Sequence, residues 1–530
     1  MSLVQVTDLT VEFGDLRAVD GLSFTLERGA ALALVGESGS GKSTVASALL
    51  GLHHGTGARL GGSIEVAGTD VQAASDGELR KLRGAKAAMV FQDPLSSLDP
   101  YYAIGDQIAE VYRVHTRASR RSARARAVEV LDRVGIPDAP RRSRSRPHEF
   151  SGGMRQRALI AMALACEPEL LIADEPTTAL DVTVQAQILD LLHTLREETG
   201  MGLLLVTHDV GVAAESVDQV LVMRHGRMVE QGPVAAVLGS PAEPYTRELL
   251  SAVPRVDAVR APSQASEEVV LEAAGLRREF GRGKRAFAAV DDVNLTVHRG
   301  ETLGVVGESG SGKTTLGRML VGLLEPTAGE VRYDGHARVG VNPAVQMVFQ
   351  DPVSSLNPRR SVGESIADPL RARGERDEGR IRGRVIELLE RVGLEGAHYQ
   401  RYPHEFSGGQ RQRVGIARAL AADPRVIVCD EPVSALDVTT QAQVVALLGE
   451  LQRELGLALV FVAHDLAVVR QVSDRVAVMR RGRIVETGPA DEVYDNPQDP
   501  YTRQLLAAVP ALDPEAAARR RAARRELAAA

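Results

Sequence analysis

Cysteine is scarce in this sequence, and its two residues, Cys166 and Cys429, both lie inside apolar runs. Two thiolates are too few for a four-cysteine iron–sulfur cluster or for an all-cysteine zinc site. We interpret both residues as buried thiols of a protein in a reduced compartment.

Long apolar runs are also missing. No run approaches the roughly 18 residues that a membrane-spanning helix needs. The N-terminal segment "MSLVQVTDLTVEFG" lacks the basic-then-apolar layout of a signal peptide. We therefore expect a cytosolic chain, although one that can dock on a membrane partner.

Aromatic residues make up 3% of the chain and the net charge is −7, so bulk electrostatics do not favour nucleic acid. Arginine supplies nearly all the positive charge, because the chain has only five lysines. Two of them, Lys42 and Lys313, lie in nearly identical segments, "GESGSGKST" (36–44) and "GESGSGKTT" (307–315). This coincidence indicates that these two lysines serve a function rather than solubility.

The rest of the chain repeats in the same way, which predicts two copies of one domain. Three further pairs of segments recur at a common spacing: "PHEFSGGMRQR" (147–157) and "PHEFSGGQRQR" (403–413), "IADEPTTALDVTVQAQ" (172–187) and "VCDEPVSALDVTTQAQ" (428–443), and "PYTRELLSAVP" (244–254) and "PYTRQLLAAVP" (500–510). Copy one has extra residues between its glycine-rich segment and "PHEFSGG", most of them around "GTDVQAASDGELRKLRGAK".

The boundary between the copies is expected after Pro254, where a short polar segment at 255–268 is interpreted as a linker. Copy one then spans 1–254 and copy two spans 269–512. The Ala/Arg-rich tail at 513–530 is interpreted as a frayed helix or disordered end in preference to a nucleic-acid arm.

Each copy opens with alternating apolar and polar residues, which predict antiparallel strands. Buried strands such as "ALALVG" and "LLIADE" then alternate with helical segments. The predicted fold class is therefore α/β, with two tandem domains that each have a mainly parallel core sheet. The helical stretch between Gln92 and Ser151 is interpreted as an inserted subdomain.

Both glycine-rich segments satisfy G-x-x-x-x-G-K-[ST] between a predicted strand and a predicted helix, which is the context of a phosphate-binding loop. Glycines let backbone N–H groups wrap the phosphates, and the helix N-terminus adds positive potential. We expect Lys42 to reach the β- and γ-phosphates of ATP and Ser43 to ligate Mg²⁺. The residues assigned to nucleotide binding are Gly36, Ser38, Gly39, Gly41, Lys42, Ser43 and Thr44, and Gly307, Ser309, Gly310, Gly312, Lys313, Thr314 and Thr315.

Two carboxylates end a buried strand in each copy, Asp174 with Glu175 and Asp430 with Glu431. Unpaired buried charge is costly, so packing alone does not account for them. We expect the aspartates to hold Mg²⁺ through water, with Thr314 as the hydroxyl ligand in copy two, and the glutamates to orient and polarise the attacking water. A strand-end salt-bridge cluster is the alternative.

A histidine ends a further strand in each copy, and we assign His208 and His464 to a γ-phosphate contact, against the alternative of ordinary core or turn residues. Gln92 and Gln350, in "FQDP", are candidates for sensing the same phosphate and for the Mg²⁺ ligand set. A solvent-exposed loop amide is the rival interpretation for both glutamines.

"SGGM" and "SGGQ" before a helix, together with the loops, carboxylates, histidines and "ALD" segments (179–181, 435–437), resemble the ATP-binding cassette (ABC) ATPases over almost all of both copies. The resemblance implies that two cassettes sandwich two ATPs, each loop facing the other cassette's signature. Site one would then add Ser407, Gly409 and Gln410, and site two would add Ser151 and Gly153. Phe13 and Phe280 align as adenine-stacking aromatics, with core packing as the alternative. Met154 replaces the usual glutamine of the signature.

Finer resemblance points to importers of the peptide/opine/nickel family, through "FQDPLSSLDP", "FQDPVSSLNP" and the two "PYTR" segments. It implies an ATP hydrolase, peripheral on the cytoplasmic face of the inner membrane, that energises two separate permease subunits. A solute-binding lipoprotein would deliver cargo, most commonly di- or oligopeptides, and glutathione is another cargo in this family. The alternative is a soluble tandem-cassette ATPase acting on ribosomes. That class has a long, charged helical linker, unlike the short one here.

Overall fold

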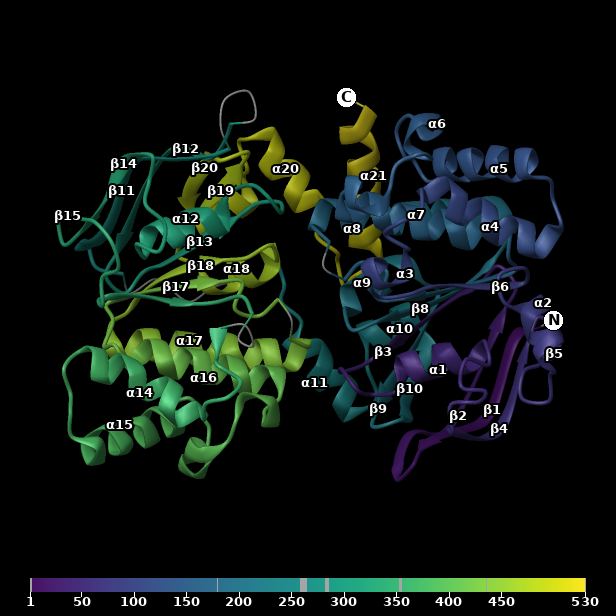
Figure 1. The fold of residues 1–530 in the computed structure, drawn as a ribbon, viewed down its shortest axis with the longest axis horizontal. Coiled ribbons are helices and arrows are strands. Elements are labelled where there is room, and N and C mark those ends of the chain that lie inside the picture. The colour runs from purple at the N-terminus through teal and green to yellow at the C-terminus, as the bar shows by residue number, and fades with distance from the viewer. Residues whose placement is uncertain are drawn as a thin grey trace. The chain divides into compact units, whose positions relative to one another are not determined.

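The computed structural model describes residues 2–178, 180–257, 265–281, 286–351, 355–434 and 436–529. The chain folds into two compact units (Figure 1). Unit 1 comprises Met1–Val253 together with Pro510–Ala530, and unit 2 comprises Pro254–Val509. Much of the proposed linker, residues 258–264, lies outside the described residues. Among the described helices, none is both long enough and apolar enough to cross a membrane.

Unit 1 opens with the antiparallel sheet that the alternating pattern predicts. Its strand order is β2-β1-β4-β5. The strands are β1 (Ser2–Phe13), β2 (Leu16–Glu27), β4 (Arg59–Val66) and β5 (Thr69–Asp70). Val4 and Val6 of β1 are buried while Gln5 between them is exposed, because successive side chains of a strand point to opposite faces.

A second sheet of six strands is the core of unit 1, in the order β10-β9-β3-β8-β7-β6. The strands are β3 (Ala31–Val35), β6 (Ala87–Val90), β7 (Leu170–Asp174), β8 (Gly202–Thr207), β9 (Gln219–Arg224) and β10 (Arg227–Pro233). All neighbours are parallel except β9 and β10. This arrangement confirms the predicted α/β class with a mainly parallel sheet.

Both faces of this sheet are covered, which is why its strands are continuous apolar runs. In β3, Leu32 and Leu34 pack into one core with the antiparallel sheet and the helix α1 (Lys42–Leu49). Ala33 and Val35 pack into a second core on the other face. The helices of unit 1 that follow are α2 (Asp76–Leu82), α3 (Pro94–Ser97), α4 (Ile104–Thr116), α5 (Arg120–Arg133), α6 (Ala139–Arg142), α7 (Gly152–Leu164), α8 (Val182–Thr199), α9 (Val210–Ser216), α10 (Val234–Gly239) and α11 (Pro244–Ala252). Helices α3 to α6 form the predicted insertion between β6 and α7.

Unit 2 repeats this plan, with sheets ordered β12-β11-β14-β15 and β16-β17-β18-β13-β19-β20. Its strands are β11 (Val269–Phe280), β12 (Phe287–His298), β13 (Thr302–Val306), β14 (Ala328–Tyr333), β15 (His336–Arg338), β16 (Val345–Val348), β17 (Val426–Asp430), β18 (Ala458–Val462), β19 (Arg475–Arg480) and β20 (Arg483–Pro489). Its helices are α12 (Lys313–Leu320), α14 (Val362–Ala372), α15 (Glu378–Arg391), α16 (Gly408–Leu420), α17 (Val438–Leu455), α18 (Leu466–Val472), α19 (Ala490–Asp495) and α20 (Pro500–Ala507).

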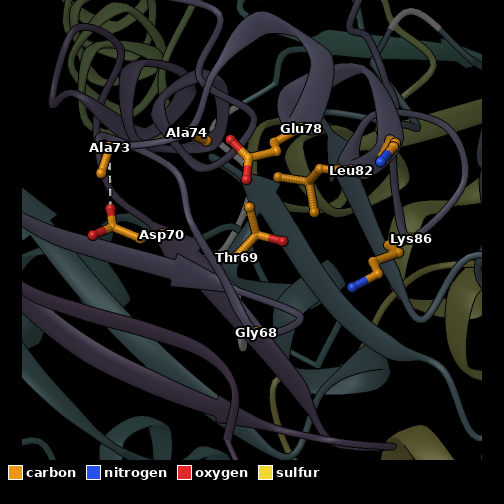
Figure 2. A pocket seen from close by; sticks show the side chains of 9 residues that line it. Gly68, Thr69, Asp70, Ala73, Ala74, Glu78, Leu82 and Lys86 are labelled. Atoms are coloured by element: carbon orange, nitrogen blue, oxygen red, sulfur yellow. Dashed lines mark hydrogen bonds between the residues drawn. The ribbon is translucent and has the colours of Figure 1, made fainter.

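The extra residues of copy one form the short helix α2 and its surroundings. Ser75 caps α2 through a capping box with Glu78, which satisfies two backbone donors that a helix start leaves unpaired. This segment lines a cavity of about 300 Å³. Thr69, Leu82 and Lys86 are among its lining residues (Figure 2). None of the cavity's lining residues belongs to the predicted nucleotide site.

The C-terminal tail differs from its prediction. The composition predicts a frayed helix or a disordered end; the tail is helical, as α21 (Pro514–Ala529), but it packs against α9 within unit 1. Ala511 and Ala517 are buried there, and Leu512 adds to the second core of that unit. The sequence pattern does not reveal this packing, because the apolar side chains involved are small and sparse.

Candidate functional site

The phosphate loop of copy one joins β3 to α1, as predicted. Lys42 is 5% exposed, and its Nζ donates to the carbonyl oxygens of Gly36 and Glu37, both at 2.8 Å. These bonds hold the ammonium group over the loop, at the N-terminus of α1. A cation and a helix N-terminus at one point make a binding site for an anion.

The loop bends where only glycine fits. Gly41 caps α1 with a φ of 97°, a left-handed conformation that residues with a Cβ rarely adopt. A Cβ at Gly41 would lie 2.4 Å from the carbonyl oxygen of Ala18. The last glycine of the motif is therefore required for two separate reasons, its conformation and the close approach of backbone.

The hydroxyl that follows the lysine meets the strand-end aspartate. Ser43 Oγ donates to Asp174 Oδ1 at 3.1 Å, although the two residues are 131 positions apart. Asp174 ends β7, and burial raises its pKa to about 6, against the opposing hydrogen bond from Ser43. The two side chains form a pair of hard oxygen donors at the base of the loop, a donor set that suits Mg²⁺.

The next residue, Glu175, is the centre of a second cluster. Its carboxylate accepts from Gln92 Nε2 at 2.7 Å and from Thr178 Oγ1 at 2.9 Å. His208 Nδ1 lies 3.2 Å from its other oxygen. The structure thus brings together three residues that the sequence assigned to the γ-phosphate end of the site. Thr178 was not predicted, and its "PTT" context gave no signal.

The backbone at this carboxylate is unusual. Glu175 has a φ of 47°, and its counterpart Glu431 has a φ of 46°. A residue other than glycine held in this region costs of order 1–3 kcal/mol and tends to occur at functional sites. Glu175 and Glu431 share this conformation, so the chain turns in the same way after Asp174 and Asp430.

Protonation follows from the contacts. Burial acts to raise the pKa of Glu175, but the hydrogen bond and charge of His208 outweigh it and hold this pKa below its ordinary value. The same hydrogen bond raises the pKa of His208. Glu175 is therefore an anion at neutral pH, as a group that polarises water must be.

Copy two reproduces both clusters. Lys313 Nζ donates to the carbonyls of Gly307 and Glu308 at 2.7 and 3.0 Å, and Thr314 Oγ1 donates to Asp430 Oδ1 at 3.0 Å. The second cluster of copy two has Gln350 Nε2 at 2.7 Å and His464 Nδ1 at 3.4 Å from Glu431 Oε2. The pKa of Asp430 is raised by burial, as in copy one. The two copies differ at one hydroxyl. Ser434 donates to the backbone carbonyl of Glu431, whereas its counterpart Thr178 donates to the side-chain carboxylate of Glu175.

Each signature serine caps the helix that follows it. Ser151 accepts from Met154 N at 3.3 Å at the start of α7, and Ser407 accepts from Gln410 N at 3.3 Å at the start of α16. In copy two, Gln410 Oε1 also accepts from Ser407 N at 3.0 Å. Met154 has no side chain that can make this return bond, so the two caps differ by one hydrogen bond.

The predicted stacking aromatics have different neighbours. Phe13, at the end of β1, is 38% exposed and contacts His53 edge to face with ring centroids 5.4 Å apart. The ring centroids of Phe280 and Phe287 lie 6.0 Å apart. Phe287 was not among the predicted site residues. The exposure of Phe13 argues against plain core packing, while Phe280 belongs to an aromatic pair.

The "PYTR" element touches the loop region in copy two. Tyr501 OH accepts from Glu308 N at 3.1 Å, and the guanidinium of Arg480 lies 4.6 Å from the Tyr501 ring. Tyr245 has the equivalent stacking partner, Arg224, at 4.4 Å. The sequence indicated this element as a family feature but gave no sign of its contact with the phosphate loop.

Family comparisons agree with this geometry. The ABC transporter model matches residues 19–178 and 290–434. The chain belongs to the ABC transporter family. The oligopeptide/dipeptide transporter C-terminal region matches residues 229–275 and 485–529 of this ABC protein. Membership makes it an ATP-binding ATPase of transport type.

Curated relatives of this ABC protein include the glutathione import ATP-binding protein GsiA of Salmonella choleraesuis (strain SC-B67) and that of Escherichia coli (strain K12). Each is 47% identical over 94% of this chain and 87% of its own length. Among solved structures, cbiO1 from Clostridium perfringens is 30% identical with a TM-score of 0.40, over 43% of this chain and 92% of its own. The ribosome-acting alternative finds no support in these comparisons.

We expect Gly41→Ala to weaken ATP binding at site one by more than tenfold and to lower the thermal stability of this ABC protein. The left-handed conformation alone costs about 1–2 kcal/mol, and the collision with Ala18 O adds to it. Gly68→Ala is the matched control, because Gly68 has a φ of 73° and open space around it. ATP titration and thermal denaturation measure both effects. Equal losses in the two variants would contradict the close-approach argument.

Proposed function

We propose that this chain is the ATP-hydrolysing subunit of an importer for glutathione or related short peptides. The observation that supports it most directly is the pair of complete clusters, one around Glu175 and one around Glu431, in a chain so similar to the import ATP-binding proteins named above. Both copies have every predicted component of the cluster, so we infer that both sites hydrolyse ATP.

Within each site, different residues bind the phosphates and activate the attacking water. Lys42 and the loop amides bind the phosphates, and Glu175 orients and polarises the attacking water. Gln92 and His208 contact the two oxygens of the Glu175 carboxylate, and we assign both to the γ-phosphate end of the site. Lys313, Glu431, Gln350 and His464 take the same roles in site two.

Magnesium fits the donors at the base of each loop. Ser43 with Asp174, and Thr314 with Asp430, offer one hydroxyl and one carboxylate each. Mg²⁺ in phosphate-transfer sites is held by one or two such groups together with waters and phosphate oxygens. Bound there, the ion would neutralise charge on the phosphates. We propose that in each copy the hydroxyl ligates the ion, the aspartate holds it through water, and the loop glutamine, Gln92 or Gln350, completes the set.

The resemblance to ABC ATPases leads us to propose that ATP is bound between a loop of one cassette and the signature of the other. Ser151 and Ser407 begin α7 and α16, so each presents a helix N-terminus, which favours an anion. Because glycine has no side chain, Gly153 and Gly409 would let the backbone of each helix start approach the phosphates. Covalent linkage of the cassettes raises their effective concentration, which favours closure within one chain.

Permease chains are the partners we propose, on the cytoplasmic face of the inner membrane, with a solute-binding protein acting on the permeases. The "FQDP" segments supply the docking surfaces. Leu95 is 63% exposed and follows Gln92 closely. In copy two, a cavity of about 470 Å³ lies beside Phe349 and is lined by Met347 and Pro369. Val353, the counterpart of Leu95, lies outside the described residues.

The test uses the chain co-expressed with candidate permease subunits from the same genome. Leu95→Cys, labelled with a benzophenone maleimide in a background where both native cysteines are alanine, should cross-link to a membrane protein. Leu16→Cys is the matched control, because Leu16 is equally exposed (66%) but lies on β2. Sealed inside-out vesicles made from the same membranes expose the ATPase to added ATP. They should show ATP-dependent transport of glutathione or short peptides.

Co-sedimentation with ribosomes at moderate salt, together with equal cross-linking from both positions, would overturn the importer proposal. Transport of a chemically different solute would leave the ATPase assignment standing but refute the cargo. The two results are separable because cross-linking needs no cargo.

A further inference from the structure

The C-terminal helix α21 contacts the two helices of unit 1 that follow the site-one motifs (Figure 1). Arg524 Nη2 donates to Glu215 Oε1 on α9 at 2.5 Å and to Asp190 Oδ1 on α8 at 2.9 Å. Arg521 donates to the backbone carbonyl of Glu215 and, at 3.0 Å, to His193 Nε2 on α8. One helix thus bridges α8 and α9 through two arginines.

The pairing is buried rather than a loose surface contact. The side chain of Glu215 is 2% exposed and that of Arg524 is 11% exposed. A buried carboxylate without its partner is strongly unfavourable, so α9 of unit 1 depends on an arginine that comes from the far end of the chain.

The acidic residues that receive the arginines exist in one cassette only. Aligning the two copies places Ala446 where unit 1 has Asp190, and Gln471 where it has Glu215. The first pair of positions lies on α8 and α17, and the second on α9 and α18. The receiving surface is therefore matched to α21 and is not a general feature of the repeated domain.

Unit 2 holds the equivalent helix by its own means. Arg470 of α18 is buried and pairs with Asp491 and Asp495 of α19, at 3.2 and 2.9 Å. Unit 1 has Ala214 at the position of Arg470, and its α10 has Ala235 and Gly239 in place of the two aspartates.

In each cassette an arginine therefore holds the helix that follows the strand-end histidine, which is α9 in unit 1 and α18 in unit 2. Only the first cassette obtains that arginine from α21.

The held helices follow site-one residues closely in the chain. Helix α9 starts directly after His208, and its cap Asp209 accepts from Gly211 N at 2.8 Å. Helix α8 starts after Asp181, the last residue of the "ALD" segment. Because α9 follows His208 with only its cap residue between, a shift of α9 would move a member of the Glu175 cluster.

We propose that α21 is a positioning clamp for site one: Arg524 and Arg521 hold α8 and α9 together and thereby set the place of His208 against Glu175. The proposal rests on the proposed ATPase function for its effect on turnover, but the docking itself does not. It makes the two ATP sites unequal, because site one needs the last residues of the chain and site two does not.

Hydrogen exchange on the full-length chain tests the docking. Arg524→Glu should speed amide exchange across α9 by about tenfold or more, since local opening governs exchange. Exchange across α18 should stay unchanged and serves as the internal reference. Arg519→Glu is the matched variant, because Arg519 is exposed on the same helix. Arg524→Lys should restore much of the protection. Unchanged exchange across α9 in Arg524→Glu would overturn the clamp.

Turnover tests the positioning. In a Glu431→Gln background, where site one alone hydrolyses, Arg524→Glu should lower kcat about tenfold, since small displacements of a reacting group cost this much or more. In a Glu175→Gln background the same change should alter kcat less than twofold. Equal losses in the two backgrounds would overturn the positioning role. If the parent chain hydrolyses no ATP, the proposed function fails, and the exchange result still decides whether α21 docks.

Discussion

Glu175→Gln is expected to leave ATP binding at site one intact and to reduce hydrolysis there by about 10²–10⁴-fold, the range typical for loss of a catalytic base. Glutamine preserves the shape of the side chain and can still meet Gln92 and His208. It removes the negative charge that the His208 contact stabilises. The variant should therefore accumulate bound ATP, and single-turnover hydrolysis measures the step directly.

Glu167→Gln is a demanding control for this variant. Glu167 is a glutamate in the same cassette with a left-handed φ of 54°, but it is exposed and pairs with Arg126 at 2.8 Å. Its replacement should leave turnover within about twofold, as expected for an exposed ion pair. Near-normal hydrolysis in both Glu175→Gln and Glu431→Gln would refute the assigned bases.

Lys42→Ala is expected to abolish tight ATP binding at site one. A hydrogen bond to a charged group contributes about 1.5–3 kcal/mol, which corresponds to a loss of roughly 10–150-fold in affinity. The loss of affinity should exceed this range, because we expect the ammonium group of Lys42 to bind both the β- and the γ-phosphate. Titration with a fluorescent ATP analogue in a Lys313→Ala background isolates site one.

Lys81→Ala provides the comparison, since Lys81 is an exposed lysine in the same cassette that lies on α2 outside the site. Its removal changes the net charge by the same amount. An equal loss of affinity in the two variants would mean that the lysine acts through general charge and not through the loop, which would contradict the proposed contact.

The sequence was sufficient for the parts of the fold and site that depend on local pattern. Lys42, Asp174 and Glu175 stand in segments whose residue types suit a phosphate site and little else, and the parallel order of their strands places them at one sheet edge. Duplication helped, because each assignment could be made twice. The hydrogen bond of Thr178 to Glu175 could not be predicted, since a hydroxyl in a turn has many possible partners.

The clamp shows where the sequence was insufficient. Glu215 and Arg524 are 309 residues apart, and an Ala/Arg-rich segment has no apolar stripe that would predict a packed helix. Its docking depends on charges of a distant surface, and only the comparison of the two copies, Glu215 against Gln471, offered a signal. The same limitation applies to Phe280, whose neighbour Phe287 follows an insertion that breaks the repeat.

Native mass spectrometry of the Glu175→Gln/Glu431→Gln double variant with Mg²⁺ and ATP tests the central claim, that one chain supplies two complete ATP sites. The two-site arrangement predicts a monomeric mass carrying two ATP molecules, and one ATP after Lys42→Ala is added. A chain that binds a single ATP before that change, or two ATPs only as a dimer of chains, would contradict it.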